Sequence, residues 1–314
     1  MTKVFIDGSA GTTGLRINER LSDRSDIELI KLPEELRKDI NARKEALNSA
    51  DIAFLCLPDA AAIEAVSLVD NPNTAIIDTS TAHRTNPCWT YGFPELLDSY
   101  DAVKKSKRIA NPGCHASGFV ALIKPLVDAG LISSDKLLHC FSLTGYSGGG
   151  KKMIAEYESA ERPALYDAPR QYGISQSHKH LPEMAKISGL SCLPLFCPIV
   201  APFYSGMEVT VTLGAGDLNI SGDAIKRIAD VYTNVYNTGR GLVKFVEEAS
   251  EDGFMSACAF SGRDDMQITV SGNEERIILV SRFDNLGKGA SGSALQNMNI
   301  LLGACETEGL NVGN

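Results

Sequence analysis

The fold of this chain is decided near its start, by the stretch Val4-Phe5-Ile6-Asp7-Gly8-Ser9-Ala10-Gly11-Thr12-Thr13-Gly14. A short apolar strand runs into a glycine-rich turn, and apolar residues at helical spacing follow through Leu21. The turn has the pattern GxxGxxG, a variant of the dinucleotide-binding fingerprint. Glycines there let the backbone approach a pyrophosphate, which lies at the N-terminus of the following helix. The position between a strand and a helix favours nucleotide binding over a purely structural turn.

Hydroxyl groups in the same turn add possible phosphate contacts. The residues expected to contact a dinucleotide are Gly8, Ser9, Gly11, Thr12, Thr13 and Gly14. An acidic residue about 20 positions beyond the glycines favours NAD, because it binds the ribose hydroxyls. Residues 31–38 offer both acids and bases at that distance. Residue types therefore leave the choice between NAD and NADP open.

Outward from this turn, strand and helix patterns alternate as far as residue 113. Continuous apolar runs at 27–32, 52–57, 75–78 and 108–110 predict strands, with helical patterns between them. Buried strands separated by helices indicate a parallel sheet covered on both faces.

The middle of the chain has a different pattern. Residues 207–213 alternate between apolar and polar, and 267–270 and 276–280 flank a hairpin-like turn. Residues 223–236 have helical spacing, and 287–302 predict a final long helix. We expect a mostly antiparallel sheet with helices on one face.

Composition limits the class of protein. The chain has 314 residues, enough for two domains, and a formal net charge of -9, which argues against a general binder of nucleic acid or anionic membranes. No apolar run approaches the roughly 20 residues of a membrane span, and the N-terminus does not resemble a signal peptide. Eight dispersed cysteines without a CxxC pair argue against a disulfide framework and a structural zinc site. The expected compartment is a reducing cytoplasm.

One cysteine has the surroundings of a nucleophile. Cys114 follows a Pro-Gly turn in the run 110–118, and apolar residues at helical spacing follow until Gly130. A cysteine at a helix N-terminus is favoured as a thiolate by the free backbone N–H groups and the helix dipole. For a lone cysteine, the alternative is a small buried apolar side chain.

A pair of histidines supplies a candidate acid and base. His178 and His180 lie one residue apart, before Pro182-Glu183. In an extended stretch both rings would face one cleft, where an imidazole could take the proton of a cysteine and return it. The alternatives are a pair of surface histidines and a metal site with Glu183.

Three further stretches have the composition of site loops. Residues 78–84 follow a predicted strand at its carboxyl end, and Arg84 could clamp a carboxylate or phosphate or form a surface salt bridge. The stretch 144–152, which includes Ser147, is predicted to be a flexible Gly/Ser loop suited to an anion. Gly287 and Gly289 begin the last predicted helix, which suggests that they pack near the cofactor.

These motifs together resemble the N-acetyl-gamma-glutamyl-phosphate reductases, of the shorter of two sequence types. The resemblance spans essentially the whole chain. The matching motifs are GxxGxxG at 8–14, Asp78-x-Ser80 through Arg84, Tyr91-Gly-Phe-Pro-Glu-Leu96, Ala110-Asn-Pro-Gly-Cys114, HxHxPE at 178–183, Gly287-Lys-Gly-Ala-Ser-Gly292 and Gln296-Asn297-Met298-Asn299.

The resemblance implies a fold and a domain organisation. The fold is a doubly wound parallel sheet of Rossmann type with an inserted α+β catalytic and dimerisation domain, as in semialdehyde dehydrogenases. Residues 1–113 plus 285–314 would bind the dinucleotide, and 114–284 would form the catalytic and oligomerisation domain. It further implies NADPH as cofactor and a homodimer or homotetramer as the assembly.

The resemblance also implies an activity: reductive dephosphorylation of N-acetyl-L-glutamyl 5-phosphate through a thioester on Cys114, in arginine biosynthesis. We assign His180 as acid and base with His178 beside it, though either could be the partner of Cys114. Arg84, Ser147 and Glu183 are assigned to the substrate and Gly287 and Gly289 to the cofactor, with no metal. The alternatives are aspartate-semialdehyde dehydrogenase, a non-catalytic NADP-binding protein with a structural Cys114, and a Cys/His metal protein.

Overall fold

The computed structural model describes residues 1–313, which divide into two compact units. The first unit comprises Met1–Pro94, Asp98–Gly113 and Ala290–Leu310. The second comprises Glu95–Leu97, Cys114–Gly289 and residues 311–313. Apart from the short segment Glu95–Leu97, the chain therefore leaves the first unit at Cys114 and returns to it at Ala290. In the described part of the chain, no helix is long and apolar enough to cross a membrane.

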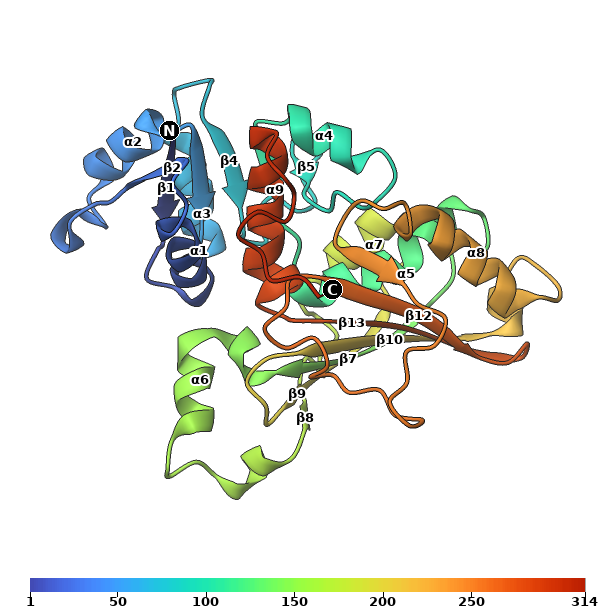
Figure 1. Ribbon diagram of the computed structural model, residues 1–314. Coiled ribbons are helices and arrows are strands. Elements are labelled where there is room, and N and C mark those ends of the chain that lie inside the picture. The colour runs from blue at the N-terminus through green and yellow to red at the C-terminus, as the bar shows by residue number, and fades with distance from the viewer. Residues whose placement is uncertain (314) are drawn as a thin grey trace. The chain divides into compact units, whose positions relative to one another are not determined.

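The first unit is built on a parallel sheet in the order β2-β1-β3-β4-β6-β5 (Figure 1). Its strands are β1 (Thr2–Asp7), β2 (Ile27–Ile30), β3 (Ile52–Leu55), β4 (Ala75–Asp78), β5 (Thr90–Tyr91) and β6 (Arg108–Ala110). The apolar runs predicted to be strands are strands in the structure, and β3 and β4 are buried along their whole length.

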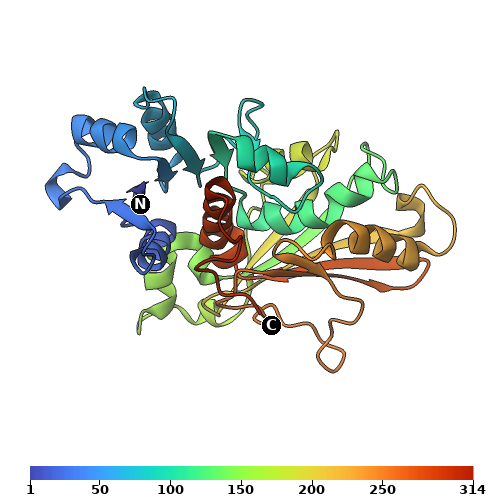
Figure 2. The ribbon, with the colours of Figure 1, turned by 45° about the horizontal axis from the view of Figure 1, so that its top comes forward.

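Helices cover both faces of this sheet. They are α1 (Thr12–Ser22), α2 (Ile40–Ser49), α3 (Asp59–Ser67), α4 (Ser99–Lys105) and α9 (Gly292–Leu302). One core cluster joins α1, α4 and α9 to the sheet, and a separate cluster joins α2 and α3 to its other face. Helix α9 packs beside α4 although some 190 residues separate them (Figure 2). The predicted doubly wound arrangement is confirmed.

The second unit is built on a mixed sheet in the order β11-β12-β13-β10-β7-β9-β8. Its strands are β7 (His139–Gly145), β8 (Arg170–Gln171), β9 (Leu195–Ala201), β10 (Met207–Gly214), β11 (Val243–Phe245), β12 (Met266–Gly272) and β13 (Arg276–Phe283). The pairs β7–β9 and β11–β12 are parallel, and the other neighbours are antiparallel. The predicted hairpin at 267–280 is β12 and β13.

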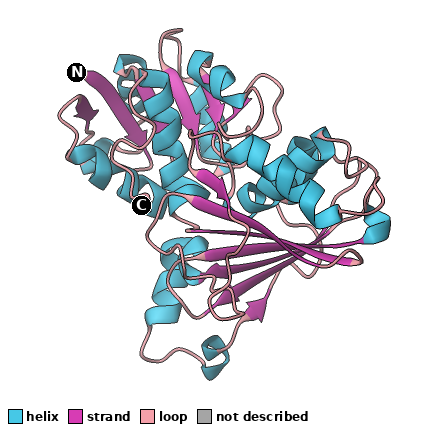
Figure 3. Ribbon diagram, turned by 45° about the vertical axis from the view of Figure 1, so that its right-hand side comes forward, coloured by secondary structure: helices cyan, strands magenta, loops and turns pink. Residues whose placement is uncertain are grey.

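Three helices of this unit gather on one face of its sheet (Figure 3). They are α5 (Cys114–Asp128), α7 (Leu181–Ser188) and α8 (Ala224–Tyr236), whereas α6 (Gly150–Glu158) follows β7. The stretch 144–152, predicted to be a flexible loop, is instead the end of β7, a 3₁₀ turn at Tyr146–Gly149 and the start of α6. The glycines of this stretch form the tight turn from strand to helix. The Gly/Ser composition therefore did not indicate a flexible loop here.

Helix α5 contains a proline, and α8 compensates for it. Pro125 has no N–H to donate to the carbonyl of Ala121 four residues earlier. The hydroxyl of Tyr236 donates to that carbonyl at 2.7 Å, and Tyr232 donates to the carbonyl of Leu122 at 2.7 Å. Both tyrosines are buried. The helix that begins at Cys114 is therefore held by hydrogen bonds from its neighbour as well as by apolar contact.

Candidate active site

Cys114 is the first residue of α5, as its sequence context predicts. Strand β6 ends at Ala110, and Asn111, Pro112 and Gly113 separate that strand from the helix. The side chain of Cys114 is half-buried, so a reagent or substrate can reach it. The unsatisfied N–H groups of a first helical turn and the positive end of the helix dipole both stabilise a thiolate at this position.

A glycine at the start of the second turn lets α5 lie directly on the sheet. A Cβ at Gly118 would stand 2.5 Å from Cγ2 of Val209 and 2.6 Å from Oγ of Ser281, both too close for any side chain. Val209 and Ser281 are paired across β10 and β13. The start of the helix, and Cys114 with it, is thus fixed at a defined height over these two strands.

A second glycine makes room for Cys114 itself. Residues Gly287–Ser291 form a π-helical turn, and a Cβ at Gly289 would stand 2.9 Å from Cβ of Cys114. In the same turn Lys288, which is fully buried, donates to both carboxylate oxygens of Glu95 at 2.7 and 2.9 Å. π-Helical turns are frequent at functional sites. Here the turn is anchored by a buried ion pair and forms one side of the cysteine's surroundings.

The two predicted histidines lie together, with a third beside them. The rings of His178 and His180 are 4.8 Å apart, and that of His115 lies 5.8 and 5.6 Å from them. The expectation of an extended stretch was wrong, because His180 has helical backbone angles and precedes α7 directly. The turn nevertheless brings both imidazoles to His115, the residue that follows Cys114.

The backbone of this turn orients His178. The N–H of His180 donates to Nδ1 of His178 at 3.2 Å. Nδ1 is therefore an acceptor, and the neutral imidazole of His178 carries its proton on Nε2. Burial and then the charge of Lys179 lower the pKa of His178. The uncharged ring consequently presents an N–H donor to its surroundings.

His115 was not predicted as a site residue, and neither were Ser142 and Tyr172. Nδ1 of His115 shares a hydrogen bond of 2.6 Å with the hydroxyl of Ser142, and Nε2 shares one of 2.6 Å with the hydroxyl of Tyr172. Burial and then His178 lower the pKa of His115 to about 3. Burial and then the neighbouring Cys114 raise the pKa of Tyr172. Only the position of His115 next to Cys114 could have drawn attention to this group.

The first unit contains a turn that fits a dinucleotide. Gly8 has φ +88°, and a Cβ there would stand 2.3 Å from the carbonyl oxygen of Cys56. A Cβ at Gly14 would stand 2.4 Å from the carbonyl oxygen of Gly8. No side chain caps the N-terminus of α1, which begins at Thr12 after Gly11. A tight glycine turn before an uncapped helix N-terminus is the arrangement that receives a pyrophosphate.

Arg84, the first of the residues assigned to the substrate, is hydrogen-bonded to backbone carbonyl groups. Arg84, in the first unit, is buried and donates from Nε to the carbonyl of Asn111 and from Nη2 to that of Thr79, each at 2.9 Å. These bonds use donors that a carboxylate clamp would need, and they tie the loop after β4 to the end of β6. Whether Arg84 also binds substrate stays a prediction.

Ser147 and Glu183 belong to the second unit and are both buried. Asn285 donates to the hydroxyl of Ser147 at 3.0 Å, which links the turn after β7 to the turn before Gly289. Glu183 lies in the first turn of α7.

Gly287, which the sequence assigns to the cofactor, also belongs to the second unit. A Cβ at Gly287 would stand 1.9 Å from the carbonyl oxygen of Arg263, so that glycine is required by packing within the second unit. The assignments of these residues to ligands stay predictions.

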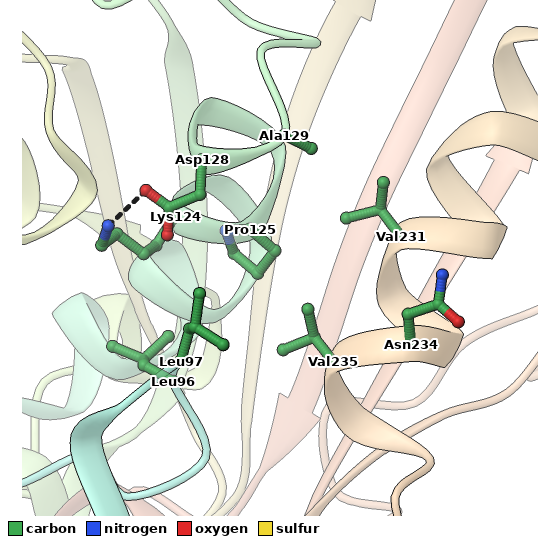
Figure 4. Close-up of a pocket in the computed structure, with 9 residues that line it drawn as sticks. All are labelled: Leu96, Leu97, Lys124, Pro125, Asp128, Ala129, Val231, Asn234 and Val235. Atoms are coloured by element: carbon green, nitrogen blue, oxygen red, sulfur yellow. Dashed lines mark hydrogen bonds and ion pairs between the residues drawn. The ribbon is translucent and has the colours of Figure 1, made fainter.

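A cavity of about 290 Å³ lies elsewhere in the second unit (Figure 4). It is lined by Leu96, Leu97, Lys124, Pro125, Asp128, Ala129, Val231, Asn234 and Val235. Lys124 is ten residues beyond Cys114, about 15 Å along α5 at the usual helical rise. The cavity is therefore separate from the cysteine and histidine cluster.

Among residues 1–313, no group of three or more His, Cys, Asp or Glu residues is arranged to hold a metal ion.

Two family models match the chain. Residues 3–105 match the NAD binding domain of semialdehyde dehydrogenase, and residues 114–285 match its dimerisation domain. The second match begins at Cys114, where the long segment Cys114–Gly289 of the second unit begins.

Curated relatives cover almost the full length. An N-acetyl-gamma-glutamyl-phosphate reductase of Brucella ovis is 44% identical over 308 residues, which are 96% of this chain and 99% of the relative. An N-acetyl-gamma-glutamyl-phosphate reductase 2 of Pseudomonas putida is 41% identical over 315 residues, 98% of each.

Solved structures share the fold at low sequence identity. Aspartate semialdehyde dehydrogenase II of Vibrio cholerae has a TM-score of 0.70 at 16% identity, over 96% of this chain and 98% of that one. The Candida albicans aspartate semialdehyde dehydrogenase, solved with NADP, has a TM-score of 0.66 at 15% identity, over 98% and 99%.

Proposed function

Because the chain belongs to the N-acetyl-gamma-glutamyl-phosphate reductases, within the semialdehyde dehydrogenase family, we propose that it reduces N-acetyl-L-glutamyl 5-phosphate to N-acetyl-L-glutamate 5-semialdehyde with NADPH. This is a step of arginine biosynthesis, and the chain is an oxidoreductase. The observation that carries the proposal is Cys114, half-buried at the start of α5 beside Gly289 and followed directly by His115, whose ring lies with those of His178 and His180.

Cys114 is the proposed nucleophile. Its thiolate attacks the acyl carbon, a carbon–sulfur bond forms, and the carbon–oxygen bond to phosphate breaks, which leaves a thioester on Cys114 and free phosphate. The N–H groups of the first turn of α5 are proposed to hold the oxygen that becomes negative during the attack. A thioester is electrophilic enough to accept hydride, whereas a carboxylate is not.

His180 is the proposed acid and base. It takes the thiol proton of Cys114 before attack and returns it to the sulfur when the reduced intermediate collapses to the aldehyde. The bond from the His180 N–H to Nδ1 of His178 supports this division, since it leaves neutral His178 with a proton on Nε2 and therefore a donor. His178 would orient the substrate or His180, and Glu183, Ser147 and Arg84 are proposed to bind the substrate.

The dinucleotide is proposed to bind at the glycine turn of residues 8–14. When bound, reduced nicotinamide supplies the hydride that reduces the thioester. Residues 1–113 plus 285–314 are proposed as the dinucleotide-binding domain and 114–284 as the catalytic and oligomerisation domain.

The preference for NADPH is supported by Lys31, which directly follows β2 and is exposed. An acid at this end of β2 binds ribose hydroxyls, whereas a base suits the 2′-phosphate.

The reverse reaction tests substrate, cofactor and reaction type together. Purified protein is mixed at alkaline pH with N-acetylglutamate 5-semialdehyde, phosphate and NADP, and the absorbance of NADPH is followed. We expect NADPH formation that depends on phosphate. Turnover of aspartate semialdehyde instead would assign the chain to the chemistry of its structural neighbours. Activity equal to wild type in Cys114→Ala would overturn the covalent route.

We propose that the chain forms a homodimer or homotetramer through the face of the second sheet that α5, α7 and α8 leave open. Phe141 on β7, Leu195 on β9 and Ile278 on β13 are 45%, 40% and 42% exposed on that face. Phe141→Asp should yield monomers in analytical ultracentrifugation. Leu165→Asp, an equally large change at an exposed leucine of the 3₁₀ turn Ala164–Asp167, should leave the assembly intact. Equal behaviour of both variants would contradict this interface.

We propose the cytoplasm as the compartment. The cysteines in the described part of the chain form no disulfide bond, including the exposed Cys88, Cys258 and Cys305. A reducing compartment preserves such thiols, and the proposed chemistry requires Cys114 to be reduced. Fractionation of cells that produce the protein at native level should place it with cytoplasmic markers, and recovery with periplasmic or membrane markers would contradict the assignment.

A further inference from the structure

Asn111, three residues before Cys114, is a buried polar residue that the proposed mechanism does not use. Its side chain is only 1% exposed. Nδ2 of this side chain donates to the carbonyl oxygen of Ala290 at 3.0 Å, and Oδ1 accepts from Nδ2 of Asn297 at 3.3 Å. Ala290 lies in the π-helical turn Gly287–Ser291, and Asn297 lies in α9. The amide of Asn111 therefore joins the segment before the nucleophile to a residue 179 positions later.

The neighbours of this amide fix its orientation. The carbonyl of Ala290 can only accept, and Nδ2 of Asn297 is identified as a donor because it also donates to the carbonyl of Gly92 at 2.9 Å. If the amide of Asn111 were turned over, two oxygens would face each other at Ala290 and two NH2 groups at Asn297. The NH2 group of Asn111 is therefore the group that reaches Ala290.

The backbone of Asn111 is held as well as its side chain. Its N–H donates to the carbonyl of Asp78 at 2.7 Å, and its carbonyl accepts from Nε of Arg84 at 2.9 Å. Pro112 follows, with the restricted φ of proline, and Asn111, Pro112 and Gly113 are all buried. Asn111 is thus a fixed point from which the chain enters α5.

Asn111 and Cys114 are connected a second time, through the π-helical turn. Gly289, the residue before Ala290, packs against Cys114, since a Cβ at position 289 would stand 2.9 Å from Cβ of Cys114. A closed loop therefore runs from Asn111 along the chain to Cys114, across to Gly289, on to Ala290 and back through the amide of Asn111. Its two non-covalent links are the Asn111–Ala290 hydrogen bond, within the first unit, and the Cys114–Gly289 contact, within the second.

We propose that Asn111 is a positioning residue for Cys114: its hydrogen bond to Ala290 closes this loop and holds Gly289 against the nucleophile. The role rests on the proposed function of Cys114. Without the bond, the start of α5 and the π-helical turn are no longer tied to each other through position 111, and the side chain of Cys114 loses its fixed place. A displacement of about 1 Å at a reacting group costs on the order of 100-fold in rate.

The first readout is alkylation of Cys114 by iodoacetamide between pH 6 and 10, mapped by mass spectrometry without substrate or cofactor. In Asn111→Ala we expect about tenfold slower alkylation near pH 7, from a profile moved about one unit to higher pH. The reason is that a displaced thiolate is less well aligned with the first-turn N–H groups of α5. A profile equal to wild type, or faster alkylation near pH 7, would overturn the proposal.

Asn48 provides the matched control within the first unit. Its Nδ2 donates to the carbonyl of Leu68 at 2.8 Å, and its Oδ1 accepts from the N–H groups of Asp70 and Asn71 at 2.7 Å each, so it too joins two segments through its amide. Asn48→Ala should lower the melting temperature and leave the alkylation profile of Cys114 unchanged. An equal slowing of alkylation in both variants would mean general loosening and would overturn the specific role of Asn111.

A double-mutant cycle tests the closed loop itself. Asn111→Ala and Gly289→Ala interrupt the same loop, so the double variant should be alkylated little more slowly than the slower single variant. The effects of Asn111→Ala and Asn48→Ala, which share no partner, should multiply. Independent, multiplying effects of the changes at positions 111 and 289 would show that the loop does not act as one unit.

Circular dichroism and thermal unfolding establish that each variant is folded before its rates are compared. If Asn111→Ala does not fold, Asn111→Ser takes its place, since it removes less volume and its hydroxyl is one bond shorter than Nδ2. In the reverse reaction, kcat of the Asn111 variant should fall by about 10- to 100-fold, with KM values changed less. A different substrate for the enzyme would leave the alkylation results unchanged, and failure of this proposal would leave the thioester route intact.

Discussion

Gly289 and Cys114 are in direct contact: a Cβ at position 289 would stand 2.9 Å from Cβ of Cys114. The contact is made by a π-helical turn whose Lys288 forms a buried ion pair with Glu95. The nucleophile is thus positioned both from its own helix and from residues 175 positions later in the chain. The glycine repeat at 287–289, which was assigned to the cofactor, packs on protein atoms of the second unit.

A methyl group at position 289 should displace the nucleophile. We expect Gly289→Ala to slow both catalysis and alkylation of Cys114, with a smaller effect on the KM values, because the side chain must move to remove the overlap. Gly216→Ala is the matched control, since a Cβ there meets no atom within 4 Å. Wild-type alkylation in Gly289→Ala would show that the contact does not position Cys114.

The bond from Tyr236 to the carbonyl of Ala121 should be needed only because of Pro125. Tyr236→Phe leaves that buried carbonyl without its partner and should lower the free energy of unfolding by about 1–3 kcal/mol. In a Pro125→Ala background the helix N–H replaces the hydroxyl, so the same change should cost much less. Urea unfolding of the four proteins measures this. Equal losses in both backgrounds would contradict the compensation.

Acidification should destabilise the protein through His115. The pKa of this ring falls from 6.5 in the unfolded chain to about 3 in the folded protein, so the unfolded state binds more protons between these values. The contribution of the neutral ring to stability is therefore present above pH 6.5 and is lost as the pH falls toward 3, by about 1.4 kcal/mol per unit.

The comparison of wild type with His115→Gln isolates this effect, because the other titrating groups are shared. Urea unfolding at pH 5, 6 and 7 should show a steeper loss of stability for wild type than for the variant. Parallel curves would mean that His115 is not a buried neutral group in solution.

Lys31 should select the phosphorylated cofactor. Lys31→Gln is expected to weaken NADPH binding by on the order of tenfold, because a charged hydrogen bond to the 2′-phosphate is lost, and to leave NADH binding unchanged. Lys44→Gln removes a lysine of α2 that pairs with Asp70 at 2.6 Å, and should change neither. Fluorescence titration of both cofactors measures these affinities. Equal losses for NADPH and NADH would exclude a contact specific to the 2′-phosphate.

The sequence predicted what depends on local pattern. The parallel sheet, its glycine turn and the helix beginning at Cys114 follow from apolar periodicity and turn residues, and all are present. The stretch 144–152 was mispredicted, because its glycines serve a compact turn rather than a flexible loop.

Contacts between distant segments could not be predicted in the same way. Tyr172 and Ser142 reach His115 only because β7 and the segment after β8 lie next to α5, and no periodicity encodes that meeting. The same holds for Glu95 and Lys288, which are 193 positions apart. Pairs of polar residues buried by tertiary packing become recognisable only when the fold is known.

The most direct test of the covalent route is the mass of the protein after incubation with N-acetyl-L-glutamyl 5-phosphate in the absence of nicotinamide cofactor. We expect one N-acetylglutamyl group per chain, released by hydroxylamine as a thioester should be, mapped to the peptide that contains Cys114 and absent from Cys114→Ala. An unmodified protein that still releases phosphate and reduces the substrate when NADPH is added, or a modification at another residue, would contradict it.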